Sequence, residues 1–252
     1  MNEIPMLCPL GPGSKYNDDE LRMLLRSVEK NVIGMSKFYL ITTHVPKWLK
    51  TDETLEIVPY GDPFEHCKDA VLIWKTIETL KRERITGDFV WVADDNCFMQ
   101  PVDIRTIPPI HNHRENRIFY ESNSGRWKER VRHTLEWAKM KGIELEHNFE
   151  AHCPERFNAT AILRNEEEAE WNDGIGLTIT TYFRVITDTY RDSHDQREYK
   201  QTFELEMDER PRTMTDEDLH SKAFIGYSDA GVRAGILDRL KRIFTEQSRY
   251  ER

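Results

Sequence analysis

The fold is decided by the stretch Gly87-Asp88-Phe89-Val90-Trp91-Val92-Ala93-Asp94-Asp95-Asn96-Cys97-Phe98-Met99. Residues 89–92 predict a buried strand, because this run is short, β-branched and aromatic, and is bounded by turn residues. Asp94 and Asp95 follow where that strand would end, and open α/β sheets bind ligands just outside the carboxyl ends of their strands. Two adjacent carboxylates repel each other unless a proton or a cation lies between them, and a hard divalent ion carrying substrate phosphates would supply that cation. A solvated turn is the alternative interpretation of such a pair.

The sequence before this stretch alternates strands and helices. Short apolar runs predict strands, and apolar residues at helical spacing predict helices. Asn17 and Glu20 have the spacing of a capping box at the start of the first helix. The order strand–helix–strand–strand–helix–strand predicts an α/β protein with a mostly parallel sheet flanked by helices. The predicted elements are strands at 6–9, 38–42 and 54–58 and helices at 17–31 and 68–84.

The sequence after residue 104 predicts a mixed C-terminal half. Residues 148–158 are loop-like, and residues 175–192 leave helix and strand open, because their composition favours a strand but their length exceeds one. No repeat, low-complexity segment or clear linker is visible, so the 252 residues predict a single domain with a sizeable core. The other predicted elements are a strand at 118–120, helices at 127–141, 159–172 and 235–247, and a short strand or turn at 224–229.

The composition predicts a polar-surfaced protein without a membrane span. Hydrophobic residues make up 38% of the chain and charged residues 32%, and no apolar run reaches the roughly 18 residues that a span needs. The first residues lack the basic start and the long apolar core of a secretory signal. The four cysteines include no C-x-x-C pair, which favours buried thiols in a reduced, cytoplasmic protein.

The net charge of −9 argues against general nucleic-acid binding, which depends on Lys and Arg side chains that neutralise phosphates. The segment 105–133 is nevertheless rich in Arg, Lys and His. Such a segment is either a solvated face or a local site for an anionic acceptor.

A glycine-rich turn, Gly11-Pro12-Gly13-Ser14-Lys15, lies between the first predicted strand and the first predicted helix. Backbone amides and a helix N-terminus at such a junction favour anions, so the turn suits a nucleotide. It matches neither G-x-G-x-x-G nor a P-loop, and an ordinary tight turn is the alternative.

Arg22 and Arg26 lie four residues apart, which places them on one face of the first predicted helix. Two guanidinium groups on one face could hold phosphates with paired hydrogen bonds. The alternative is that they pair with acidic residues of their own helix.

Two further candidates lie far along the chain. His152 falls in a predicted loop, where a neutral imidazole could complete a carboxylate-rich metal site or act as a base. Asp229 follows Ser228 after the apolar run at 224–227. An isolated loop histidine more often has no such role.

These motifs occur in an order that resembles the Stealth-type sugar-phosphate transferases and related small bacterial and phage glycosyltransferases. The resemblance covers nearly the whole chain, and its motifs are short. Ala93 stands where that family has a polar residue, and Ser228 stands where it usually has Asn. The segments that carry the resemblance are 13–30, 38–42, 45–49, 89–99, 151–157, 224–229 and 248–251.

The resemblance implies a GT-A fold, a Rossmann-like sandwich in which residues 1–104 bind a nucleoside-diphosphate sugar and residues 105–252 face the acceptor. It implies a divalent ion, Mn²⁺ or Mg²⁺, at the acid pair. It also implies roles for individual residues: Asp94, Asp95 and His152 toward the metal; Gly11, Gly13, Ser14, Arg22, Arg26 and Asp94 toward the nucleotide and its phosphates; and His152 and Asp229 in catalysis.

The expected function is therefore metal-dependent transfer of a sugar from a nucleoside-diphosphate sugar to an acceptor hydroxyl. The acceptor would be a glycan or polysaccharide, with a hydroxylated base in phage DNA as a second class. The closest rival is sugar-1-phosphate transfer, in which a nucleoside monophosphate leaves. A module that binds nucleotide sugars without catalysis is the third possibility.

Overall fold

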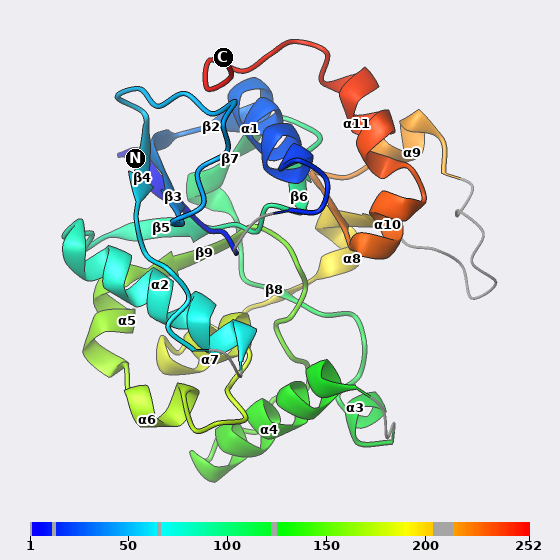
Figure 1. Ribbon diagram of the computed structural model, residues 1–252. Coiled ribbons are helices and arrows are strands. Elements are labelled where there is room, and N and C mark those ends of the chain that lie inside the picture. Colours follow the sequence, from blue (N-terminus) through cyan, green and yellow to red (C-terminus); the bar gives the residue numbers. More distant parts are fainter. Residues whose placement is uncertain (1, 12–13, 65–66, 122–124, 204–213) are drawn as a thin grey trace.

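The computed structural model describes residues 2–11, 14–64, 67–121, 125–203 and 214–252. A five-stranded sheet with the order β4-β3-β1-β5-β9 forms its centre (Figure 1). The first four strands are parallel, and β9 runs antiparallel to β5. The bounds of these strands are β1 Ile4–Pro9, β3 Met35–Ile41, β4 Leu55–Val58, β5 Asp88–Trp91 and β9 Glu155–Asn158.

Helices cover both faces of this sheet, which explains why its parallel strands are continuous apolar runs. Leu7 of β1 packs in the core cluster that includes α2 (Lys68–Arg82) and α7 (Ile179–Ile186). Its neighbours Met6 and Cys8 point to the other face, into the cluster that includes α1 (Asp19–Asn31). The predicted α/β class and the mostly parallel sheet are therefore confirmed.

The chain reverses its direction of winding next to β1. From β1 it passes through α1 to β3 and then β4 on one side, and it returns through α2 to β5 on the other side. Loops that leave the carboxyl ends of β1 and β5 therefore diverge, and open α/β sheets bind ligands in the crevice that such a divergence leaves. This topology places residues 10–11, 14–16 and 93–95 at one end of the sheet.

The second half adds smaller sheets and short helices around that end. A three-stranded sheet has the order β11-β12-β6, and two-stranded sheets join β2 to β7 and β8 to β10. The strands are β2 Val32–Ile33, β6 Asn96–Phe98, β7 Val102–Asp103, β8 Ile110–His111, β10 His194–Asp195, β11 Lys200–Phe203 and β12 Phe224–Tyr227. The helices are η1 Ile104–Thr106, α3 Arg117–Glu121, α4 Arg126–Met140, α5 Ala159–Asn165, α6 Glu168–Trp171, α8 Gln196–Tyr199, α9 Asp216–His220, α10 Asp229–Arg233 and α11 Ile236–Ile243.

The structure corrects the predicted capping box of the first helix. The N-cap of α1 is Asp18, which has a left-handed backbone and makes no capping hydrogen bond with its side chain. The Glu20 carboxylate instead accepts a hydrogen bond from the Ser14 hydroxyl at 2.6 Å. The first turn of α1 therefore binds the preceding loop and forms no capping box.

Other corrections concern the second half. The predicted strand at 118–120 is part of helix α3, where the Ile118 amide donates to the Glu115 carbonyl at 3.1 Å. Strand β9 lies inside the segment predicted to be loop, and the predicted helix at 159–172 is divided into α5 and α6. The ambiguous segment 175–192 contains helix α7.

Among the helices of the described residues, none combines the length and the apolar character that crossing a membrane requires.

Candidate functional site

A cavity of about 510 Å³ opens at the carboxyl ends of β1 and β5, where the sheet topology predicts a ligand. One wall consists of the loops that leave these two strands, and the opposite wall comes from the second half of the chain. Among its lining residues are Gly11, Ser14, Lys15, Tyr16, Glu20, Lys68, Asp69, Asp94, Asp95, Trp127, Arg130, Glu150, His152, Tyr227 and Asp229.

The acid pair lies half-buried on the floor of this cavity. Burial raises the pKa of Asp94, and the charge of the neighbouring Asp95 carboxylate adds to this effect, so that the pKa is about 7. Asp95 accepts two hydrogen bonds. Its carboxylate accepts from the side-chain amide of Asn96 at 2.9 Å, and its backbone carbonyl accepts from the backbone amide of Tyr227 at 3.2 Å. In the described part of the chain, no other residue's side chain donates a hydrogen bond to Asp94. Within the described residues, its own backbone amide and the Lys68 charge are what favour the charged form of Asp94.

The loop after β1 supplies the next part of the wall. Gly11 and Ser14 line the cavity, whereas Gly13 lies outside the described residues. The Ser14 hydroxyl donates to Glu20 and accepts from the Tyr16 amide at 2.9 Å, and the Ser14 amide donates to Asp18 at 3.2 Å. Helix α1 thus holds this loop against the cavity through its first turn.

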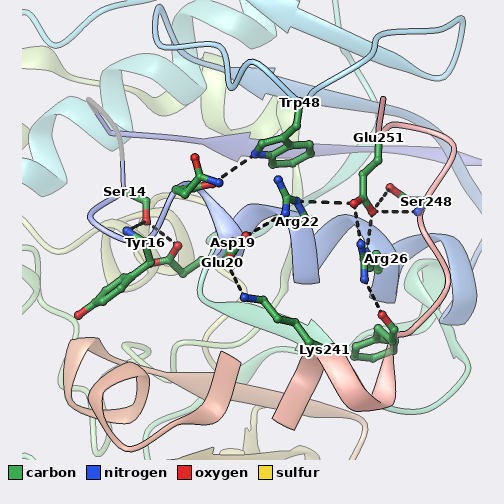
Figure 2. Close-up of polar contacts among 12 residues, drawn as sticks. Ser14, Tyr16, Asp19, Glu20, Arg22, Arg26, Trp48, Lys241, Ser248 and Glu251 are labelled. Atoms are coloured by element: carbon green, nitrogen blue, oxygen red, sulfur yellow. Dashed lines mark hydrogen bonds and ion pairs between the residues drawn. The ribbon is translucent and has the colours of Figure 1, made fainter. Parts of the chain in front are cut away.

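Arg22 and Arg26 do not line the cavity, and both instead contact Glu251 (Figure 2). Arg26 binds the Glu251 carboxylate through Nε and Nη2, at 2.7 Å each, and donates to the Phe244 carbonyl at 2.8 Å. Arg22 pairs with Asp19 at 3.1 Å and stacks over the Trp48 ring at 4.6 Å. The two guanidinium groups fasten the C-terminal segment to α1, so the structure does not bring them to the acid pair.

His152 and Asp229 do reach the cavity. His152 has a left-handed backbone with φ of 50°, which is unusual for a residue with a side chain. The surrounding protein lowers the pKa of the imidazole by desolvation, and the nearby Asp95 charge opposes that decrease. Asp229 lies at the rim, where its side chain is 66% exposed and 3.9 Å from the Lys15 ammonium. Both candidates therefore line the cavity with solvent-exposed side chains.

The sequence does not single out several charged residues that line the cavity. Lys68 and Asp69 begin α2, and Arg130 of α4 forms an ion pair with Asp69. Burial raises the pKa of Asp69 to about 6, against the opposing effect of the Arg130 charge. Glu150 is buried, and its Oε1 accepts from both the amide and the hydroxyl of Thr181 at 2.9 Å. The position of Lys68 and Asp69 could have been predicted from the sequence, because a crossover helix that returns antiparallel to the strands begins at their carboxyl ends.

The described residues contain no group of three or more His, Cys, Asp and Glu side chains that could hold a metal ion by itself. Magnesium-type sites, however, commonly use one or two carboxylates and complete their shell with substrate phosphates and water. Asp94 and Asp95 fit that mode, because they are adjacent carboxylates that line the cavity, and no other described residue's side chain donates a hydrogen bond to Asp94. The residues are thus suited to an ion that arrives with a phosphorylated ligand.

Several side chains of the basic segment 105–133 are paired with acidic residues of the described chain. Arg105 pairs with Asp103 at 2.7 Å and lines a second cavity, away from the acid pair. Arg130 is paired inside the first cavity, and His133 contacts Asp173 at 2.7 Å. These contacts reduce the number of charges that the segment offers to an anionic acceptor.

Comparison of the chain with known protein families and with curated proteins finds no match. The geometry of the cavity is therefore the basis of the functional conclusion.

Proposed function

We propose that this protein is a metal-dependent glycosyltransferase that uses a nucleoside-diphosphate sugar as donor. One observation carries the proposal: residues predicted independently from distant motifs line a single cavity at the switch point of the sheet. They are Gly11, Ser14, Asp94, Asp95, His152 and Asp229.

The lining residues suggest an orientation for the donor. The nucleotide would lie along the loop after β1, which Ser14 and Glu20 hold in place. Its diphosphate would then lie over Asp94 and Asp95, and the sugar would point toward His152 and the second half of the chain. A divalent ion at the acid pair would neutralise the charge on the diphosphate.

His152 is the side chain best placed to accept the proton of the acceptor hydroxyl. Its lowered pKa keeps the imidazole neutral near pH 7, which is the form that accepts a proton. The neighbouring Asp95 carboxylate would stabilise the imidazolium that forms. Asp229 is mostly exposed and contacts Lys15, so we assign it to the rim, where it would orient the acceptor.

The first test measures donor binding and turnover. A thermal-shift screen of nucleotide sugars, with and without Mn²⁺, should show a metal-dependent rise in melting temperature for one donor. Asp95→Asn should abolish both that shift and donor hydrolysis or transfer. Asp238→Asn is the matched control, because Asp238 is an exposed carboxylate on α11. Full activity of Asp95→Asn would refute the assignment.

The released nucleotide then distinguishes the reactions. A nucleoside diphosphate identifies glycosyl transfer, whereas a monophosphate identifies sugar-1-phosphate transfer. An acceptor panel should contain neutral glycans, acidic polysaccharides and DNA with hydroxylated bases. Tight donor binding without turnover on any of these would favour a binding module.

A further inference from the structure

The proposed donor raises a question of charge balance in the cavity. A diphosphate gains negative charge as it leaves, and sites for such groups normally supply cationic side chains. The arginines predicted for this role, Arg22 and Arg26, are engaged with the C-terminal segment. Among the described lining residues the cationic side chains are Lys15, Lys68 and Arg130.

Two of these three cations already have acidic partners. Arg130 is paired with Asp69, and it also donates to the Cys67 thiol at 3.7 Å. The Lys15 ammonium lies 3.9 Å from Asp229 on a side chain that is 82% exposed, so it belongs to the rim. Neither is positioned as an uncompensated cation over the acid pair.

Lys68 differs from both. It forms no ion pair within the described part of the chain, and its side chain is exposed to solvent at the cavity. Burial raises the pKa of Asp94, and the Lys68 charge opposes that increase, so the ammonium lies within electrostatic reach of the acid pair. The same charge acts on His152. Lys68 thus lines the same cavity as both groups that the proposed reaction uses.

The position of Lys68 in its helix supports a ligand-binding role. It is the first residue of α2, a helix of 15 residues. The helix dipole is positive at this end and disfavours a cationic side chain, whereas it favours an anionic ligand. A lysine here opposes local helix stability and strengthens the attraction for an anion.

We propose that Lys68 binds the donor diphosphate and neutralises the charge that develops on it, the role that the sequence suggests for Arg22 and Arg26. This inference rests on the proposed function. In the step, the bond between the anomeric carbon and the phosphate oxygen breaks, and its electron pair goes to that oxygen beside Lys68. The acceptor oxygen forms the new bond to carbon, and its proton passes to His152.

The test compares Lys68→Met and Lys68→Arg with wild type by calorimetry. The probes are a panel of nucleoside diphosphates and their parent nucleosides, each measured with and without Mn²⁺. Lys68→Met should keep the affinity for the nucleoside and lose about tenfold or more of the extra affinity for the diphosphate. Lys68→Arg should recover most of that extra affinity. Lys139→Met is the matched control, because Lys139 is an exposed lysine of α4 that does not line the cavity.

Turnover gives an independent readout. With the donor identified by the thermal-shift screen, Lys68→Met should lower kcat by about 10²-fold, while its melting temperature stays at the wild-type value or above. Equal diphosphate affinity in Lys68→Met and wild type would overturn the role of Lys68 and leave the proposed function standing. A wild-type protein that binds no nucleoside diphosphate would overturn both.

Discussion

The cluster that joins Arg26 to Glu251 makes the clearest prediction about stability (Figure 2). Arg26→Met keeps the length of the side chain and removes its donors. Two of the lost hydrogen bonds, at 2.7 Å each, end on Glu251, and the third, at 2.8 Å, ends on the Phe244 carbonyl. The variant therefore removes the main partner of the Glu251 carboxylate, whose side chain is only 4% exposed.

The magnitude follows from burial and from the partners that remain. Removing one member of a fully buried ion pair costs about 3–5 kcal/mol. Arg26 is 12% exposed, and Arg22 remains 3.6 Å from Glu251, so part of that cost is relieved. We expect a loss of about 2–3 kcal/mol in the free energy of unfolding, because hydrogen bonds to charged groups contribute about 1.5–3 kcal/mol each and are not additive. A protein of this size should then melt roughly 5–10 °C lower.

Urea unfolding at neutral pH, followed by tryptophan fluorescence, measures this loss. Arg164→Met on α5 is the control, because Arg164 is exposed and forms no ion pair within the described residues. The double variant of Arg26→Met with Glu251→Gln should be less destabilised than the sum of the two single variants. An unchanged unfolding midpoint would refute the structural role. A folded Arg26→Met protein that loses diphosphate affinity would instead restore the phosphate role that the sequence suggests.

Three further predictions concern stability. Burial opposes the charged form of Glu251, but the hydrogen bonds from Arg26 and Ser248, together with the Arg26 charge, outweigh it and lower the pKa below its ordinary 4.5. The advantage of wild type over Glu251→Gln should thus be complete above that value and be lost as urea midpoints are followed to more acidic pH, through the lowered pKa. Arg184→Met should cost about 3–5 kcal/mol in urea unfolding, since it leaves Glu155 buried and unpaired, and adding Glu155→Leu should recover most of the loss. Gly226→Ala should reduce the free energy of unfolding by about 1–3 kcal/mol and so lower the melting temperature, because its Cβ would lie 3.1 Å from the His152 carbonyl oxygen. An unchanged melting temperature in scanning calorimetry would contradict this expectation.

The parallel half of the sheet can be predicted because its information is local. Each parallel strand in the centre is a short apolar run that both layers of helices bury. Strand β9 lacks this signal, because its first residue, Glu155, is charged. The structure buries that carboxylate completely through Arg184 of α7, which lies 29 residues further along the chain. No sequence pattern within β9 indicates that Arg184 is the partner of Glu155.

The candidate site likewise contains residues that the sequence predicts and residues that it does not. Asp94, Asp95 and Gly11 are predictable because they follow apolar strands, and strand ends collect at one edge of a parallel sheet. Arg130 and Glu150 carry no such signal, since only the packing of α4 and of the segment before β9 brings them to the cavity. Their residue types alone would place them on a solvated surface.

The two arginines show the limit of helical spacing as a signal. Positions four residues apart correctly place Arg22 and Arg26 on the same face of α1. Spacing does not determine which part of the molecule that face meets, and Glu251, the partner of Arg26, is 225 residues away in the sequence. Local pattern therefore found the pair and, for Arg22, an acidic partner on its own helix in Asp19, but it could not indicate the distant partner of Arg26.

The absence of these arginines from the cavity has a consequence for binding. Carboxylates outnumber cationic side chains among the described lining residues, and Asp69 already neutralises Arg130. A diphosphate entering alone would meet repulsion from Asp94 and Asp95 that Lys68 offsets only in part. A divalent ion alone would gain just two adjacent carboxylates, which is a weak shell. Each ligand should therefore raise the affinity of the other by the same factor, as thermodynamic linkage requires. Under the proposed function, donor and metal bind as a coupled pair.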